Sequence, residues 1–234
     1  KEKWDEALPG STRALALSRD PDAWVRERLA ALKAENKLTL LRRMNGEGYE
    51  GFRSDTPRLG AGSFTNLARN GGFSDEKCPA VSGAIDEWKE GRSPAGWSSW
   101  QEDASKGRFL WDRETGASGT GCAMAMNVKG GCFIQAYEVK PGEMYHVASS
   151  GRVRGNGKIH MRIRWQTPEG KWTHEKLDRM FFPQAIAGKE WLEMTGVVEV
   201  PESAGKLLIL LGVGEQASSE GIAWFDDVQL YRVE

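Results

Sequence analysis

From Ser63 onward, short stretches of the chain alternate apolar and polar residues and are separated by glycine, proline and asparagine. The clearest alternation runs from Ile159 to Trp165, where Met161 and Ile163 are apolar and the residues between them are polar or basic. Because successive side chains of a strand point to opposite faces, this pattern predicts strands with one buried face. About eight such stretches occur without a helical pattern between them, which predicts an all-β sandwich of two antiparallel sheets.

Two turn sequences predict which strands pair. The first is Gly155-Asn156-Gly157, which predicts a hairpin over residues 145–166. The second is Lys129-Gly130-Gly131, which predicts a hairpin between residues 123–128 and 133–139. Further strands are expected over residues 191–200 and 206–213 and at the end of the chain.

Residues 1–65 read differently from the rest. Asp20-Pro21-Asp22 has the features of a helix start, and apolar residues at helical spacing follow it, which predicts a helix over residues 21–35. One helix and a short apolar run cannot bury a core by themselves. We therefore expect residues 1–65 to be a flank that packs on something else. It is either the last helix of an upstream catalytic domain or a segment docked on the β domain of residues 66–234.

The composition narrows the classes of function. The chain has 234 residues, of which 39% are hydrophobic and 28% charged, as in an ordinary globular protein. A net charge of −1 gives no support for binding to nucleic acid or to a membrane surface, and no apolar run is long enough to span a bilayer. No nucleophile, phosphate-loop or dinucleotide motif is present. The three cysteines lack zinc-ligand spacing, so we expect buried free thiols.

The final strand, residues 223–230, carries two adjacent carboxylates. Asp226 shares the alternation of Trp224, which predicts that it points inward, whereas Asp227 should point outward together with Phe225. Carboxylates on opposite faces cannot flank one scissile bond, so we do not expect this pair to catalyse hydrolysis. A buried carboxylate does need a cation or hydrogen-bond donors.

Asn70-Gly71-Gly72-Phe73, the closing strand and the glycine-punctuated strands between them resemble, in order and spacing, a known family. It comprises the galactose-binding-like jelly-roll carbohydrate-binding modules found at the ends of polysaccharide-degrading enzymes. The resemblance covers about residues 66–234 and implies a jelly-roll sandwich. It also implies a structural calcium held by oxygen ligands. The ligands expected here are Asp226, Asp75, Asn70 and Gly72. Because Ser74-Asp75 replaces the family's usual Glu, hydrogen bonding of Asp226 to backbone amides of the first loop is the alternative.

The predicted pairing gathers basic side chains, an amide and an indole on one sheet face. Beyond the turn at Pro168-Glu169-Gly170, Trp172 lies opposite Gln166. The other expected pairs are Arg152 with His160, Arg154 with Lys158, and His174 with Arg164. The face then carries Arg152, His160, Arg162, Arg164, Gln166, Trp172 and His174. Because indole stacks on sugar rings and arginines capture carboxylate or sulfate, we expect an acidic glycan here. A solvated sheet face, or one covered by residues 1–66, is the alternative.

Tryptophan is abundant, with ten residues, but Trp97, Trp165 and Trp224 fit core positions, so abundance alone is poor evidence for a ligand. If the ligand does not bind the arginine-rich face, the next candidates are aromatic residues expected in loops at the sandwich edge. These are Trp88, Trp100 and Trp111.

These observations favour a non-catalytic module that binds polysaccharide and belongs to a larger secreted, periplasmic or cell-surface protein. Its expected partners are a carbohydrate ligand and an upstream catalytic domain of the same chain. One alternative is a structural β-sandwich that docks an upstream glycoside hydrolase domain without binding sugar itself. A further alternative, an autonomous hydrolase or lyase, lacks a convincing acid/base pair.

Overall fold

The described part of the chain is built from ten strands and one short 3₁₀ helix. The structure, a computed structural model, describes residues 65–78, 87, 91–185, 190–216 and 220–232. Asn66–Leu230 forms one compact unit, which contains the strands described below apart from the last two residues of the final strand. The helix predicted over residues 21–35 lies outside the described residues, so this helix and the domain boundary near residue 66 stay predictions.

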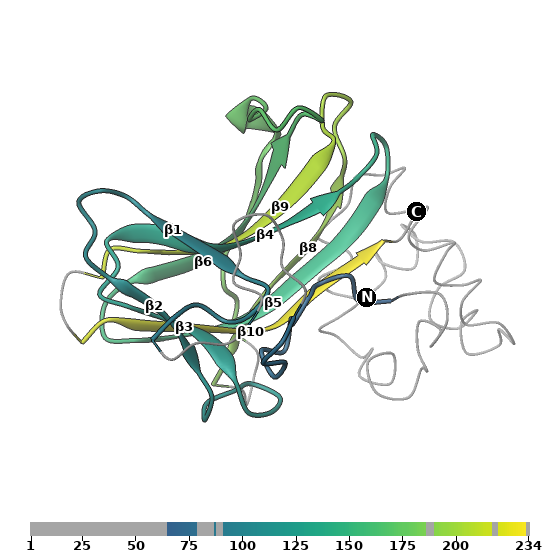
Figure 1. Cartoon of the computed structure of the whole chain (residues 1–234). Coiled ribbons are helices and arrows are strands. Elements are labelled where there is room, and N and C mark those ends of the chain that lie inside the picture. Colours follow the sequence, from purple (N-terminus) through teal and green to yellow (C-terminus); the bar gives the residue numbers. More distant parts are fainter. Residues whose placement is uncertain (1–64, 79–86, 88–90, 186–189, 217–219, 233–234) are drawn as a thin grey trace, which may run out of the picture. The chain divides into compact units, whose positions relative to one another are not determined.

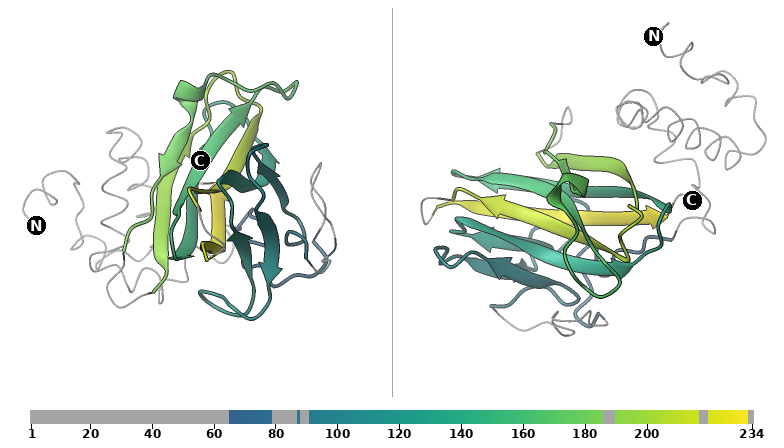
Figure 2. Two further views of the ribbon diagram at one scale, coloured as in Figure 1. Left: turned by 90° about the vertical axis from the view of Figure 1, so that its left-hand side faces the viewer. Right: turned by 90° about the horizontal axis from the view of Figure 1, so that it is seen from above.

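The strands form two layers of five, which confirms the predicted jelly-roll β-sandwich (Figure 1). The first sheet has the order β1-β4-β9-β6-β7, and the second has the order β2-β3-β10-β5-β8. The first sheet consists of β1 (Ser98–Gln101), β4 (Gly130–Glu138), β9 (Lys206–Gly214), β6 (Lys158–Gln166) and β7 (Arg179–Phe181). The second consists of β2 (Arg108–Asp112), β3 (Cys122–Met126), β10 (Ile222–Arg232), β5 (Met144–Arg154) and β8 (Leu192–Glu199). Figure 2 shows the layers from two further directions.

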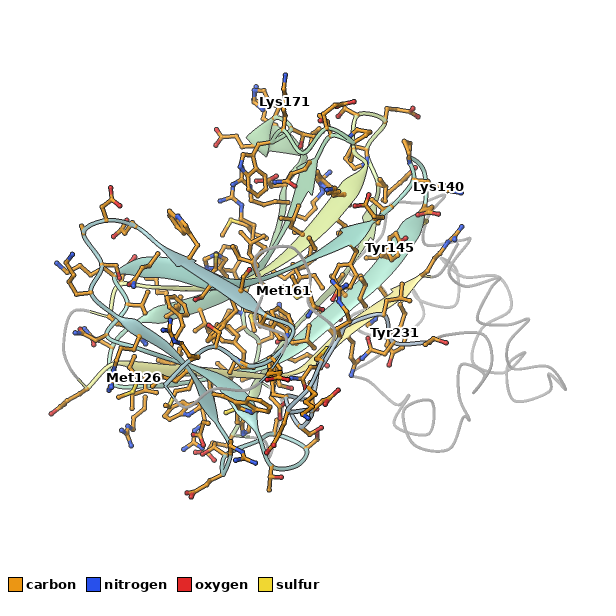
Figure 3. All side chains as sticks on the ribbon, viewed as in Figure 1. Met126, Lys140, Tyr145, Met161, Lys171 and Tyr231 are labelled. Carbon is orange, nitrogen blue, oxygen red and sulfur yellow. The ribbon has the colours of Figure 1, made fainter. Side chains whose placement is uncertain are left out.

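The core lies between the two sheets and follows the predicted alternation. On β6, Met161 and Ile163 are fully buried, and Figure 3 labels Met161 between the layers. Phe133 of β4 packs edge-on against Phe109 and Phe225 from the opposite sheet, with ring centroids 5.0 and 6.3 Å apart. The three cysteines are buried and free, as expected. Such aromatic contacts across the gap hold the layers together through apolar burial.

Both predicted hairpins are wrong. β5 and β6 flank the turn at residues 155–157 but belong to different sheets, and so do β3 and β4. Gly155 and Gly157 do adopt the positive φ values that a tight turn needs, 73° and 134°. The turn, however, carries the chain across the gap between the layers. β5 therefore pairs with β8, and β6 pairs with β9.

The predicted alternation also fails in the middle of β10. Asp227 has a φ of 50°, and this left-handed residue shifts the side-chain direction by one position. Phe225, expected to point outward, lies fully buried in the main core, as does Val228 three residues later. Trp224 instead belongs to a separate cluster with Cys122 and Ile222, on the outer side of the second sheet.

The start of the unit is fastened to β10 by hydrogen bonds. The Leu67 amide donates to the Leu230 carbonyl at 2.8 Å, and the Val228 amide donates to the Gly71 carbonyl at 2.9 Å. The side chain of Asn66 donates to the Val228 carbonyl and accepts from the Leu230 amide. The entry segment thus satisfies backbone groups of β10 that would otherwise be unpaired.

We predict that Gly71→Ala destabilises the fold and that Gly72→Ala does not. A Cβ on Gly71 would lie 2.2 Å from the Val228 carbonyl oxygen, which is backbone and cannot move without disturbing β10. A Cβ on Gly72 would have no atom within 4 Å. Urea denaturation should show a loss of roughly 1–3 kcal/mol for the first variant, as for other overpacked sites. Equal stability of the two variants would contradict this account of the entry segment.

Candidate functional site

The side chains of the first sheet that point away from the core form its outer face. The strand register aligns them in rows across the sheet. One row contains Trp100, Cys132, Gly212 and His160, and the next contains Ser98, Ile134, Leu210, Arg162 and Met180. The predicted outward direction of His160, Arg162, Arg164 and Gln166 is thereby confirmed, since the intervening residues of β6 are buried.

Trp172 lies at one end of this face, as predicted. A turn at residues 167–171 reverses the chain, and Gln166 and Trp172 form an isolated antiparallel bridge. The indole is 48% exposed, and the guanidinium carbon of Arg164 lies 4.1 Å from its ring centroid. Figure 3 labels the preceding residue, Lys171. Trp172 is thus an open aromatic surface with one side held by an arginine.

Asp178 links the two arginines of the face, and it was not anticipated from the sequence. Its Oδ2 atom accepts hydrogen bonds from Arg162 Nε at 3.0 Å, Arg162 Nη2 at 2.6 Å and Arg164 Nε at 3.1 Å. The carboxylate is only 4% exposed. It follows η1 (Glu175–Leu177), which is anchored where Trp165 Nε1 donates to the Leu177 carbonyl at 3.0 Å. No sequence signal separates Asp178 from the other acidic residues of this loop.

A groove of about 750 Å³ is lined partly by this face; Trp172 and Arg164 do not line it, whereas Tyr145 of the second sheet does. It includes Gln166, the bridge partner of Trp172, and it reaches past the end of the short strand β1 to the entry segment at Arg69. Apolar lining comes from Ile134, Ala136 and Leu208, and polar lining from Arg69, Ser98, Glu138, Gln166 and Lys206. Lys206 and Glu138 form an ion pair at 3.4 Å. The groove therefore combines apolar contact area with hydrogen-bonding groups.

Trp100 and His160 lie at the other end of the face. Trp100 is 57% exposed, and the register places it in the same row as His160 with two strands, β4 and β9, between them. The imidazole lies over Gly212, where a Cβ would come within 2.3 Å of His160 Nε2. Burial, together with the charge of Arg162, lowers the pKa of His160, so the ring is neutral at pH 7.

Three predicted binding residues lie elsewhere. Arg152 belongs to the second sheet, where it pairs with Glu190 at 2.6 Å and lies 5.2 Å from the Trp224 ring, because β5 does not pair with β6. Trp111 is not a loop aromatic but a core residue of β2, 9% exposed. His174 does not continue the ladder opposite Arg164, because its Nδ1 accepts the Lys176 amide and caps η1. Trp88 lies outside the described residues.

Asp226 is buried as predicted, with 1% exposure, but its described hydrogen bonds do not reach residues 70–75. Its Oδ2 accepts the Ala117 amide and its Oδ1 accepts the Asp227 amide, both at 2.7 Å. The hydrogen-bonded version of the predicted tie to the first loop is therefore wrong, because Asp226 fastens the loop after β2 instead. Burial raises the pKa of Asp226 to about 6, and the hydrogen bonds only partly offset this effect.

The other predicted calcium ligands are engaged with backbone. Asn70 donates to the Asp75 and Ala95 carbonyls and accepts the Asp75 amide, while Asp75 Oδ1 accepts the Lys77 amide. Gly72 is exposed. Within the described ranges, no three His, Cys, Asp or Glu side chains come together as a metal-binding group. These hydrogen bonds hold the first loop, and calcium binding stays a prediction.

No family model and no curated protein matches the chain. Solved structures of similar fold include the enzymatically active domain of bacteriophage CBA120 tailspike protein 4, with a TM-score of 0.50 and 14% identity over 71% of this chain and 21% of that chain. The CBM22-1 xylan-binding domain of Paenibacillus barcinonensis Xyn10C has a TM-score of 0.47 and 10% identity over 74% of this chain and 97% of that domain. TmCBM61 in complex with β-1,4-galactotriose has a TM-score of 0.44 and 14% identity, over 72% of this chain and 99% of that one.

The similarity to these structures is one of fold. The matched part of the tailspike protein is about a fifth of its chain. Two of the three structures described are carbohydrate-binding modules. The described part of this chain contains no helix with the length and apolar character that a membrane crossing requires.

We predict that, in EDTA, the stability contribution of Asp226 falls as the pH rises. The folded-state pKa, about 6, lies above the ordinary value of 3.8, so the folded state binds the proton more tightly. Stability from this group is therefore present below about pH 4 and is lost as the pH passes 6, by at most about 3 kcal/mol. Chemical denaturation across this range should show a smaller fall for Asp226→Asn, which cannot titrate. Identical pH profiles would contradict the prediction.

Calcium should reverse this trend if it binds at Asp226. A bound cation favours the ionised carboxylate, so added calcium should raise the melting temperature at pH 7 and EDTA should lower it. Asp226→Asn should abolish the response. If neither calcium nor EDTA shifts the melting temperature, and elemental analysis finds no ion, the calcium prediction is wrong.

Proposed function

We propose that residues 66–234 are a non-catalytic carbohydrate-binding module and that the outer face of the first sheet is its binding surface. The observation that carries the proposal is the exposed indole of Trp172 next to a groove with both apolar and hydrogen-bonding groups. The apolar faces of sugar rings stack on indole, and their hydroxyls need polar partners at the ring edge. Trp100, exposed on the same face, supplies a second such surface.

The carboxylates of this face favour binding over bond cleavage. Among the described residues that line the groove, Glu138 is the one carboxylate, and it pairs with Lys206. Asp178 is buried and accepts hydrogen bonds from two arginines. A glycosidase of the usual kind needs two accessible carboxyl groups on either side of the scissile bond. The arrangement therefore supports recognition of a glycan without hydrolysis.

The ligand that best fits the Trp172 end is a glycan with acidic sugars. Arg162 and Arg164 carry two positive charges against the single negative charge of Asp178, so this end keeps an excess of positive charge. Guanidinium groups bind carboxylate and sulfate through charge-assisted hydrogen bonds. Neutral sugars retain the stacking contact but lack the ionic one.

The module would serve as the targeting part of a longer, secreted polysaccharide-active protein, with a catalytic domain upstream. The motivation is the resemblance of the sequence to modules of such enzymes. Sequencing of the complete coding region tests this part of the proposal, since the absence of an adjacent catalytic domain would overturn it and leave the binding proposal intact.

We predict that Trp172→Ala weakens glycan binding by roughly 1–3 kcal/mol, the range found for aromatic stacking on planar rings. Because the indole is exposed and outside the core, the melting temperature should change little. Affinity electrophoresis against a panel of neutral and acidic polysaccharides should reveal the ligand, and calorimetry should quantify the loss. Unchanged binding would move the site away from Trp172, first to the Trp100 end of the face.

We predict that Arg164→Ala reduces affinity for acidic glycans more than for neutral ones, with a difference that shrinks as salt rises. Arg154→Ala is a matched control, because Arg154 also lies over an indole, that of Trp224 at 5.8 Å, but on the second sheet. The control should leave binding unchanged. Equal losses on neutral and acidic chains would remove the acidic preference and leave Trp172 as a general stacking surface.

A further inference from the structure

We propose that Asp178 is a positioning residue that aligns Arg164 to select carboxylate-bearing sugars. This inference rests on the proposed function and specifies how the Trp172 end of the site discriminates between ligands. Asp178 would touch no ligand itself, because its side chain is only 4% exposed. It would act by fixing the direction in which Arg164 presents its remaining donors.

The geometry around Asp178 holds both arginines through a single oxygen atom. Oδ2 accepts three hydrogen bonds, two from Arg162 and one from Arg164 Nε. The other oxygen, Oδ1, is buried and has no hydrogen-bond partner in the described part of the protein. Burying a carboxylate oxygen without a partner costs free energy of folding. Neutralising the charge of the two arginines, which an exposed carboxylate could also do, therefore does not explain why Asp178 is buried.

Arg164 is restrained on two sides. Asp178 binds its Nε, and the Trp172 ring lies 4.1 Å from its guanidinium carbon. Its terminal nitrogens, Nη1 and Nη2, make no hydrogen bond to any residue that the structure describes. Nη1 and Nη2 lie in one plane and match the two oxygens of a carboxylate, whose sugar ring can then stack on Trp172.

The segment that carries Asp178 is itself anchored to the core. Trp165 donates its indole N–H to the Leu177 carbonyl, one residue before Asp178. Because Trp165 is buried between the sheets, the position of the carboxylate is set by core packing before any ligand arrives.

Charge compensation and positioning predict opposite results when Asp178 loses its charge. If the carboxylate only neutralises the arginines, Asp178→Asn adds positive charge to the site and raises the affinity for acidic chains. If it positions Arg164, the same change loosens the guanidinium and lowers that affinity. We expect a fall of about tenfold or more, equivalent to the loss of one charge-assisted hydrogen bond.

A second pair on the other sheet provides the control for net charge. Glu190 pairs with Arg152, which lies over the Trp224 ring, so Glu190→Gln removes one negative charge from a similar acid–arginine–indole group.

Arg164→Lys is a second test that does not alter Asp178. It keeps the charge but removes the planar pair of donors, and it should lose affinity for acidic chains almost as fully as Arg164→Ala.

The experiment uses the full chain and affinity electrophoresis through gels containing polygalacturonate, alginate, neutral galactan or xylan. Circular dichroism and thermal melting confirm folding of each variant. Reduced retardation of Asp178→Asn and Arg164→Lys in the acidic gels, with Glu190→Gln like wild type, supports the proposal. Increased retardation of Asp178→Asn, or an unchanged Arg164→Lys, overturns it. So does a wild type retarded only by neutral polymers. A wild type retarded by no polymer overturns the proposed function itself.

Discussion

The burial of Trp165 is the interaction on which the site most depends. The side chain lies between the sheets, which fixes the register of β6 and so sends Arg164 and Gln166 to the outer face. The same residue also holds both ends of the segment 173–177, which lies between Trp172 and Asp178. Its carbonyl accepts a hydrogen bond from the Thr173 amide, and its indole donates one to the Leu177 carbonyl. Core packing and site geometry are therefore coupled through one side chain, and loss of the core contact would disturb both.

Side-chain direction could be predicted from the sequence better than strand pairing could. Alternation is a property of each strand alone, so the buried and exposed faces of β6 were foreseen. The glycines at 155–157 show that the chain reverses, but not whether it returns to the same layer or crosses to the other, and here it crosses. At Asp227, a residue type tolerant of positive φ shifts the pattern by one position without a sequence warning. Asp178 depends on two arginines 14 and 16 residues away, which no local pattern reveals.

The two sheets contain the same arrangement of three side chains, and the two arrangements differ in how exposed the indole is. On each, an arginine lies over an indole and is paired with an acid. Trp224 is covered, hydrogen-bonded to Asp112 and part of a buried cluster, whereas Trp172 is open. Residue type alone therefore does not separate a structural tryptophan from a ligand platform. The exposure of the ring does: Trp100 and Trp172 are 57% and 48% exposed, whereas Trp224 is 6% exposed.

The order of the strands has a consequence for biosynthesis. β9 lies between β4 and β6, and β10 lies between β3 and β5, so the central partners of both sheets come last in the unit (Figure 1). While these strands are still being synthesised, β4 and β6 lack their shared neighbour and expose unpaired backbone edges. Neither layer can be completed from the emerging N-terminal part, and most pairing is between residues distant in sequence, which slows folding. The nascent chain must therefore keep its edges from associating with other chains until its final strands leave the ribosome.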